Sequence, residues 1–545
     1  MQAYLRYWAF AAAFVALLLT ALAWAAGRLP AGWVALAAAF AAIGVHDVVQ
    51  RRHAVLRNYP IQGHLRFFIE AVRPELRQYL FESDTESVPF SRLQRDIVYQ
   101  RAKQALDKRP FGTQLDVYAA GYEWINHSLA PRPVPAHDFR IAIGGPQCAR
   151  RYDASVFNVS AMSFGALSAN AILALNRGAA RGRFAHDTGE GSISRYHREG
   201  GGDLIWEIGS GYFGCRDANG RFDEARFVEN ACADQVRMIE IKLSQGAKPG
   251  HGGVLPGPKV TPEIAAARGV PEGVDCISPA SHSAFDSPAG LLRFVDELRR
   301  LSGGKPTGFK LCIGHPWEWF GIAKAMLETG IVPDFIVVDG AEGGTGAAPL
   351  EFTDRVGAPL QEGLLLVHNT LVGLGLKPRI RIGAAGKVVS AFDIARLMAL
   401  GADWCNSARG FMFALGCIQS LHCHTGACPT GVATQDPLRQ KALQVVDKTE
   451  RVYRFHQNTL HALQELVQAA GLHHPSEITA SHIVRRAGDH DVRLLANQLP
   501  LLKPGALLDA IEGRAEWPHN VYRLYWPMAR TDSFSPAADA ASATS

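Results

Sequence analysis

Short apolar runs rich in β-branched residues alternate with Ala- and Leu-rich stretches from about residue 150 to residue 430. Strands separated by helices form a parallel sheet, and about eight such repeats can close that sheet into a barrel. The candidate strands are 156–160, 184–187, 205–208, 238–243, 275–277, 308–312, 334–339, 379–383 and 403–406. These nine runs exceed the eight positions of a barrel by one, so we expect one of them to lie outside it.

A doubly wound parallel sheet is the alternative fold for this alternation. No GxGxxG segment follows the first candidate strand, so a dinucleotide-binding turn has little support. Lys and Arg number 56 against 51 Asp and Glu, and a net charge of +5 over 545 residues gives no support for binding nucleic acid. The sequence predicts an α/β protein built on a (β/α)8 TIM barrel.

The start of the chain contains two apolar runs without charged residues, 8–26 and 31–45. The first has nearly the length of about 20 residues that a membrane-spanning helix needs, and the second reaches it with the four residues that follow. Arg6 precedes the pair and Arg51 follows it, while Arg28 alone lies in the turn. This distribution predicts a transmembrane hairpin in the inner membrane with the main domain facing the cytoplasm. A secretory signal is the alternative.

The rest of the chain divides by composition. An adaptor rich in Arg, Tyr and Phe precedes the barrel, helices follow it, and the end is rich in Ala, Ser, Thr and Asp. The predicted organisation is a transmembrane hairpin at 1–50, a helical adaptor at 51–140, the barrel with a cysteine loop at 141–436, helices packed on the barrel at 437–532 and a disordered tail at 533–545.

Polar and glycine-rich segments follow the candidate strands, at the end where barrel enzymes bind their substrates. Glu240 and Lys242 alternate on one face of a strand, where inward charge must be paired or must meet a ligand. A structural ion pair between these two residues is the alternative. Lys242, Gln245 and Lys248 are candidates for holding a dicarboxylate or the anionic side of a reduced flavin. Glu190, between glycines at another strand end, is a further candidate, although taken alone this motif is better explained as a plain turn.

Lys310 is a lone cation in a central strand. It either pairs with a neighbouring barrel carboxylate or stabilises negative charge on a reduced flavin. Gly343 and Gly344 belong to a glycine-rich loop that leaves room for a bulky ring, or that forms a flexible surface loop. The segments after the last two strands, where barrels commonly bind a cofactor phosphate, contain Gly386, Lys387, Arg409 and Gly410.

Cys417, Cys423 and Cys428 are three of nine cysteines, none of which forms a CxxC pair, so a disulfide framework is not indicated. Three thiolates at this irregular spacing suit a cluster with three cysteine ligands, such as a three-iron type. A zinc site that includes His422 or His424, and plain buried thiols, are the alternatives.

These motifs resemble the synthase domain of glutamate synthases. Segments 160–168, 188–191, 240–253 and 343–346 and the most specific one, 416–435, occur in the same order as in that domain. The whole chain, with its N-terminal hairpin, resembles the stand-alone FMN-binding glutamate synthase family proteins of bacteria. The resemblance implies a barrel with FMN and a three-iron, four-sulfur (3Fe-4S) cluster that passes electrons to FMN. Reduced FMN would then transfer hydride to 2-iminoglutarate, which forms from 2-oxoglutarate and ammonia.

The resemblance also implies roles for individual positions. The cofactor-binding positions are Met162, Ser163, Lys310, Gly343, Gly344, Gly386, Lys387, Arg409 and Gly410. The substrate-side and catalytic positions are Glu190, Lys242, Gln245 and Lys248, with Glu190 the candidate proton donor. The cluster ligands are Cys417, Cys423 and Cys428.

Three departures from the family pattern shape the functional hypotheses. No glutaminase-like segment and no NAD(P)H domain are evident, so we expect free ammonia and electrons from ferredoxin or a separate reductase. Tyr212 replaces the arginine of the family's Ser-Gly-Arg-Phe-Gly segment, and Arg216 is the candidate to take that arginine's place. A membrane-associated FMN and iron–sulfur oxidoreductase acting on a different substrate is therefore the alternative function. A scaffold without activity is a third hypothesis, but it predicts loss of the cysteines and glycine loops, which are present.

Overall fold

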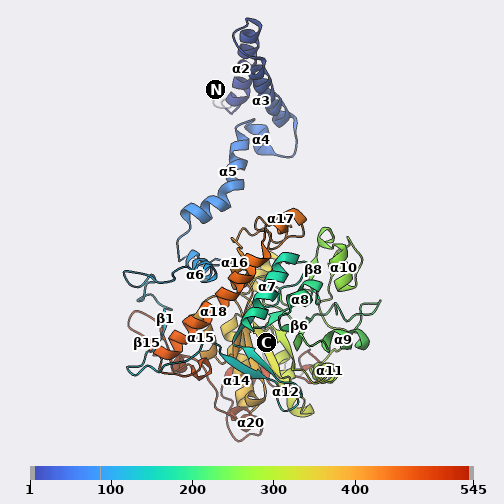
Figure 1. The fold of residues 1–545 in the computed structure, drawn as a ribbon, viewed down its shortest axis with the longest axis vertical. Helices are drawn as coiled ribbons and strands as arrows, with labels where there is room; N and C mark the ends of the chain where they lie inside the picture. Colours follow the sequence, from blue (N-terminus) through green and yellow to red (C-terminus); the bar gives the residue numbers. More distant parts are fainter. Residues whose placement is uncertain (1–5, 86–87, 539–545) are drawn as a thin grey trace. The chain divides into compact units, whose positions relative to one another are not determined.

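The computed structural model describes residues 6–85 and 88–538, and it forms two compact units, Met1–Glu86 and Ser87–Ser545. The division after residue 86 falls within the segment predicted as an adaptor. The predicted tail at 533–545 extends beyond the described residues. The two units are described separately below (Figure 1).

The N-terminal unit is built on two apolar helices, α2 (Trp8–Ala25) and α3 (Ala31–Val49), which pack against each other. Their mean hydropathies are 2.0 and 1.7, so both are long and apolar enough to cross a membrane. The unit continues through α4 (Ala54–Asn58), α5 (Gly63–Leu76) and the π-helical turn η1 (Arg77–Phe81).

A buried carboxylate joins the end of this hairpin to the helices that follow. Asp47, near the end of α3, is fully buried; it accepts a hydrogen bond from the backbone N–H of Ile61 at 2.9 Å and lies 2.9 Å from Nε2 of His64. These hydrogen bonds compensate for the removal of the Asp47 carboxylate from water, which would otherwise be unfavourable in an apolar helix.

Eight parallel strands close into a barrel in the second unit, and consecutive strands of the chain are neighbours around it. The strands are β4 (Phe157–Val159), β5 (His186–Asp187), β6 (Leu204–Ile208), β7 (Val236–Lys242), β10 (Thr307–Leu311), β11 (Phe335–Asp339), β12 (Arg381–Ala385) and β13 (Trp404–Ser407). Strand β13 pairs with β4 and closes the ring. The predicted TIM barrel is confirmed, and the doubly wound alternative is wrong.

The candidate strand at 275–277 is the one that lies outside the barrel. It forms β9 (Cys276–Ile277), which pairs antiparallel with β8 (Val254–Leu255) in a separate two-stranded ribbon. This ribbon belongs to the long connection between β7 and β10, next to the cavity described below.

Helices surround the barrel, and several begin with the capping residues that the sequence provides. Ser168 caps the first of them and accepts a hydrogen bond from Ala171 N–H at 3.2 Å, and Ser287 followed by proline starts another. The helices are α7 (Ala169–Gly182), α8 (Arg195–Gly200), α9 (Glu224–Ala231), α10 (Pro262–Arg268), α11 (Pro288–Leu301), α12 (Pro316–Thr329), α13 (Leu350–Arg355), α14 (Leu360–Gly373), α15 (Ala391–Ala399) and α16 (Arg409–Leu415). Short 3-10 turns lie at η2 (Gly257–Lys259), η3 (Lys377–Arg379) and η4 (Pro475–Glu477).

The segments before and after the barrel pack on it and on each other. The long helix α18 (Val445–Ala469) contacts α6 (Arg92–Lys103), α7 and α16 (Figure 1). A three-stranded antiparallel sheet combines β1 (Glu123–Ile125) with β14 (Ile483–Arg486) and β15 (Val492–Leu494). The remaining helices are α17 (Pro437–Lys441), α19 (Leu495–Gln498), α20 (Ala506–Ile511) and α21 (Asn520–Tyr525).

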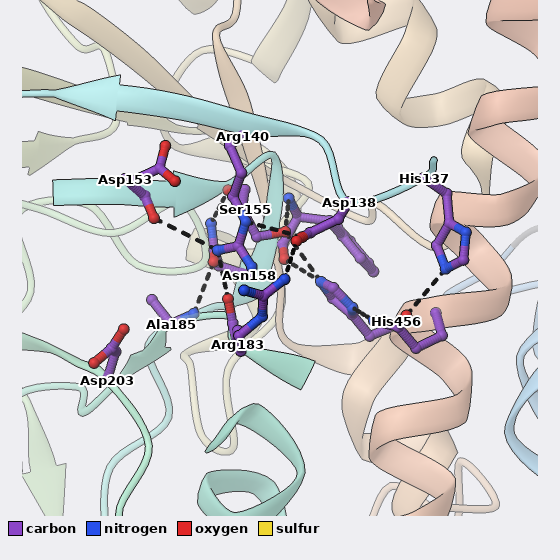
Figure 2. Close-up of polar contacts among 12 residues, drawn as sticks. His137, Asp138, Arg140, Asp153, Ser155, Asn158, Arg183, Ala185, Asp203 and His456 are labelled. Atoms are coloured by element: carbon purple, nitrogen blue, oxygen red, sulfur yellow. Dashed lines mark hydrogen bonds and ion pairs between the residues drawn. The ribbon is translucent and has the colours of Figure 1, made fainter. Parts of the chain in front are cut away.

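The amino end of the barrel is closed by an antiparallel hairpin of β2 (Arg140–Ile143) and β3 (Tyr152–Ser155). Figure 2 shows the polar contacts at this end. Asn158 Nδ2 donates to the carbonyl of Ser155 at 2.7 Å while its Oδ1 accepts from Ala185 N–H at 2.9 Å, and His456 Nε2 lies 3.1 Å from the Ser155 hydroxyl. Ligands therefore reach the barrel from its opposite end.

Asp334 ties the hairpin to the barrel, and we expect its removal to destabilise the fold. Its carboxylate accepts from the Arg299 guanidinium at 2.8 Å, from Thr307 N–H at 2.9 Å and from Gly145 N–H at 2.8 Å. Because Arg299 would stay buried without this partner, Asp334→Ala should lower the free energy of unfolding by about 3–5 kcal/mol. Denaturant titration measures this. The exposed pair of Asp532 with Arg530 provides the control, since Asp532→Ala should change little; equal effects would contradict the prediction.

Candidate functional site

A cavity opens at the carboxyl ends of the barrel strands, as the strand-end motifs predict. The predicted site residues that line it are Met162, Ser163, Glu190, Lys242, Gln245, Lys248, Lys310, Gly343, Gly344, Gly386, Lys387, Arg409 and Cys423. Three predicted site residues do not line it. Gly410 lies behind the wall beside Ser407 and Phe455, and Cys417 and Cys428 lie deeper in the cysteine loop.

Two glycines allow the loops around the cavity to approach each other closely. A Cβ on Gly246, after β7, would lie 1.8 Å from the carbonyl oxygen of Gly340, after β11. Gly189, after β5, has φ +63°, and a Cβ there would lie 2.7 Å from the amide of Ser163. Any side chain at these positions would displace the backbone of a neighbouring loop.

An ion pair lies in the cavity at the ends of β5 and β7. Lys242 Nζ, at the end of β7, is 3.0 Å from Glu190 Oε2, in the loop after β5. The structural pair of Glu240 with Lys242 that the alternation allowed is wrong, because Glu240 faces Lys310 instead, at 3.5 Å. Burial works against ionisation of Glu190, but Lys242, Arg268 and Lys248 outweigh it and hold its pKa below the ordinary value. Glu190 is thus a carboxylate, which weighs against its predicted role as proton donor.

Arg268 is a site residue that the sequence analysis missed. It ends α10, lines the cavity and is 4% exposed. Its Nη2 donates to the carbonyl of Phe164 at 3.1 Å, and its guanidinium lies 5.1 Å from the centre of the Phe213 ring. Among the described residues, its Nε has no hydrogen-bond partner. Because no motif surrounds this arginine, only the tertiary structure shows that it joins Lys242 and Lys248.

Tyr212 does not line the cavity. It is fully buried, and burial raises the pKa of its hydroxyl. The Nε2 of His282 donates to the carbonyl of Lys242 at 2.8 Å, so its Nδ1 accepts from the Tyr212 hydroxyl at 3.1 Å. That hydroxyl also accepts from Ala284 N–H at 3.0 Å. Arg216 lies outside the cavity too, with its guanidinium 5.7 Å from the Phe213 ring centre. The structure thus places Arg268, rather than Arg216, at the cavity.

We expect Tyr212→Phe to act on stability rather than on cofactor content. The change leaves the buried Nδ1 of His282 without its donor, which costs about 1–3 kcal/mol, and removes the acceptor of the Ala284 amide. The free energy of unfolding and the absorbance of bound flavin measure the two effects. Tyr196→Phe is the matched control, because that hydroxyl lies near the surface beside Glu263 and its loss should cost less than about 1 kcal/mol. Loss of bound cofactor in Tyr212→Phe would contradict the prediction.

Lys310 forms the structural ion pairs that one interpretation predicts, and its position at the cavity leaves the flavin role a prediction. It forms ion pairs with Glu207 and, at 3.5 Å, with Glu240, as the structural interpretation predicts. It also lines the cavity, together with Glu207. A buried ammonium is thereby fixed at the floor of the cavity by carboxylates of β6 and β7.

The opposite part of the cavity is cationic and bounded by glycine loops. Arg409, the first residue of α16, donates from Nη2 to the carbonyl of Thr345 at 2.8 Å, which fixes the loop after β11 beside it. Lys387 has φ +51°, and its ammonium lies 5.8 Å from the ring centre of Phe90. Positive side chains beside exposed loop backbone are the groups that bind a cofactor phosphate in barrels.

The cysteine loop follows α16 and borders this cationic part. Arg409 Nη1 lies 3.9 Å from Cys423 Sγ, and Lys259 Nζ donates to the carbonyl of Cys423 at 2.7 Å. Burial raises the pKa of Cys417. Burial also works against ionisation of Cys428, but hydrogen bonds from the Thr430 hydroxyl and from backbone amides outweigh it and lower the pKa of that thiol.

The spacing of the cysteines bears on which metal group they suit. In the described part of the chain, the three sulfur atoms do not all lie within 4.8 Å of one another. A tetrahedral zinc ion would hold them about 4 Å apart. Three thiols at this wider spacing fit a larger, sulfur-rich group better than a zinc ion.

Comparison with known proteins agrees with this site. Residues 147–473 match the conserved region in glutamate synthase. The chain belongs to the glutamate synthase family. The Glutamate synthase large subunit-like protein YerD of Bacillus subtilis (strain 168) is 37% identical to it over 494 residues, which are 83% of this chain and 94% of that protein.

Two further similar proteins align with smaller parts of this chain. The Archaeal glutamate synthase (NADPH) of Methanocaldococcus jannaschii is 36% identical over 315 residues, 58% of each chain. Among solved structures, a mutant flavocytochrome b2 with pyruvate bound is 12% identical, has a TM-score of 0.40 and covers 76% of this chain and 85% of its own. The family match includes all the predicted site residues, and the chain is an oxidoreductase of the glutamate synthase type.

Proposed function

We propose that this chain makes glutamate from 2-oxoglutarate and ammonia, using FMN and a 3Fe-4S cluster. The observation that carries the proposal is the group of three cations around one carboxylate in the cavity. Lys242, Lys248 and Arg268 all act on Glu190. Three positive charges and one negative charge leave two positive charges, which match the two carboxylates of 2-oxoglutarate.

The residues of this chain bind and orient the substrate. Lys248 and Arg268 are 6% and 4% exposed, so a carboxylate that they hold is largely removed from water, where charged hydrogen bonds are strongest. The unpartnered Nε of Arg268 is a donor ready for such a ligand. Fixing both carboxylates orients the reacting carbon toward the cofactor side of the cavity, and orientation is a large part of catalysis between two bound groups.

The cofactor side fits FMN in its charge and its loops. Lys387 and Arg409 would hold the phosphate, and Gly343, Gly344 and Gly386 would let the ring approach the backbone. Lys310 would stabilise negative charge on the ring. When bound, FMN supplies the hydride, which no side chain of this site can supply. Cys417, Cys423 and Cys428 would hold the cluster beside Arg409, with electrons from ferredoxin or a separate reductase.

The two apolar helices are the basis for proposing attachment to the inner membrane. Arg51, Arg52 and Arg57 follow α3, whereas Arg28 alone lies in the turn between α2 and α3. Positive residues are retained on the cytoplasmic side, so the barrel would face the cytoplasm. The alternative function, action on a different substrate, was motivated by Tyr212. Because that residue lies outside the cavity, it gives no reason to replace 2-oxoglutarate.

A visible spectrum with flavin and iron quantitation on anaerobically purified full-length protein tests the proposal. The dithionite-reduced protein is then mixed with 2-oxoglutarate and ammonia. We expect both cofactors, reoxidation of the flavin and formation of glutamate. Bound cofactors without reoxidation would show that the substrate is wrong, and absence of flavin would overturn the proposal as a whole.

A further inference from the structure

A layer of acidic side chains lies inside the barrel at the floor of the cavity. Asp187, Glu207 and Glu240 come from the neighbouring strands β5, β6 and β7, and their carboxylate oxygens lie within 4.8 Å of one another. All three residues are at most 1% exposed. Glu207 lines the cavity, whereas Asp187 and Glu240 lie behind it. Neither of those two is needed for binding in the proposed function.

The layer contains more negative than positive charge. Lys310 is its single cation and pairs with Glu207 and Glu240. Glu207 and Glu240 are direct partners on adjacent strands, so like charges face each other there. If all three carboxyl groups were ionised, two negative charges would remain uncompensated in the barrel interior. Because burying unpaired charge is very costly, the layer keeps protons instead.

Carboxylate oxygens without hydrogen-bond partners indicate which side chains hold a proton. Neither carboxylate oxygen of Glu240, nor Oδ2 of Asp187, accepts a hydrogen bond from any described group. A proton held between these two carboxyl groups makes one of them the missing donor for the other. A metal ion is a poor alternative, because the ammonium of Lys310 already serves as the cation of the cluster.

We propose that Asp187, Glu207, Glu240 and Lys310 form a proton store, in which Asp187 and Glu240 share a proton and a second proton enters from solvent when negative charge is placed in the cavity. Added negative charge attracts the Lys310 ammonium and weakens its compensation of Glu207 and Glu240, so the layer binds protons more tightly. Removal of that charge releases the proton again.

The charged groups that face this layer are known. Asp339 from β11 faces Lys310 and Glu207, and Lys242 from β7 faces Asp339 in turn; burial raises the pKa of Asp339. Burial and the neighbouring Glu207 raise the pKa of Asp187 to about 7, so its proton exchanges near neutral pH. Burial and Asp187 raise the pKa of Glu240 well above its ordinary range, which assigns the standing proton to Glu240.

The store rests on the proposed function in one respect: the negative charge is that of a reduced flavin. With FMN bound, its reduction by two electrons and one proton would place one negative charge in the cavity above Lys310. The store then takes a further proton from solvent, and it returns that proton on reoxidation. The total number of protons taken up per flavin on reduction is therefore larger than the one proton that binds to the ring.

The test measures proton uptake with an indicator dye in weakly buffered solution while dithionite reduces the flavin of the full-length protein. Asp187→Asn keeps the oxygen that accepts from Gly189 N–H at 3.0 Å but cannot take up a proton. We expect it to lose up to about half a proton per flavin relative to wild type at pH 7, and up to about one proton at mildly alkaline pH, where Asp187 is ionised before reduction. Glu328→Gln, an exposed glutamate on α12, is the matched control and should not change uptake. Equal uptake in wild type and Asp187→Asn overturns the proposal.

Infrared spectroscopy tests the store even if the variant does not fold. Reduction of the wild-type protein should increase a deuterium-sensitive carboxylic acid band, and its absence overturns the proposal. If the protein binds no flavin, the proposed function fails by itself. In that case the cofactor-free protein should still show a carboxylic acid band that titrates near neutral pH, and absence of that band overturns the store.

Discussion

Cys423→Ser is expected to lose nearly all of the cluster iron while FMN stays bound. A serine oxygen is a harder ligand than a thiolate and binds iron–sulfur clusters weakly. Cys423 is the only cysteine of the described part of the chain that lines the cavity, so it lies between the proposed cluster and the proposed cofactor. The Arg409 guanidinium keeps its hydrogen bond to Thr345 in the variant, and the phosphate side of the cavity therefore stays intact.

Quantitation of iron and flavin on the same sample tests this prediction. Turnover measured with two kinds of electron supply provides a second test. Donor-driven turnover should fall at least about a hundredfold, because the cluster is the route for electrons. Reoxidation of a chemically reduced flavin by 2-oxoglutarate and ammonia should change little. Cys232→Ser is the control, since that thiol is exposed and lies outside the loop. Unchanged iron in Cys423→Ser would show that the ligand assignment is wrong.

The barrel could be predicted because most of its strands are short apolar runs that stand out between helical stretches. The run at 275–277 has the same composition as a buried strand. What removes it from the barrel is its antiparallel pairing with Val254 and Leu255, a contact across twenty residues that no local pattern records. The local sequence indicates which segments form strands, but it does not indicate which strands pair with each other.

The candidate site could likewise be predicted only in part. Glycines and charged residues at strand ends were visible in the sequence, because a barrel gathers its strand ends at one face. The pairing of their charges was not visible. Glu240 and Lys242 share one face of a strand, yet Lys242 meets Glu190 and Glu240 meets Lys310, since the register between strands decides which side chains approach. Arg268 reaches the cavity from the end of a helix outside the barrel strands, so no strand motif includes it.

Arg268→Gln is expected to raise the KM for 2-oxoglutarate strongly and to leave FMN and iron in place. A buried arginine with an unpartnered Nε can give a carboxylate charged hydrogen bonds that glutamine cannot replace. Hydrogen bonds to charged groups contribute about 1.5–3 kcal/mol, so the expected loss in kcat/KM is about 10- to 100-fold. Glutamine keeps one donor for the carbonyl of Phe164, which preserves the local structure.

Arg216→Gln is the matched control, because both arginines lie against the ring of Phe213 and only Arg268 lines the cavity. Steady-state kinetics over a range of 2-oxoglutarate concentrations distinguishes the two variants. If the cavity binds the dicarboxylate through Lys242, Lys248 and Arg268, Arg268→Gln should raise the KM for 2-oxoglutarate. The KM for ammonia in this variant should stay near the wild-type value. A larger effect from Arg216→Gln would instead place the substrate on the far side of Phe213, and the two positive charges around Glu190 would then have to serve another anion.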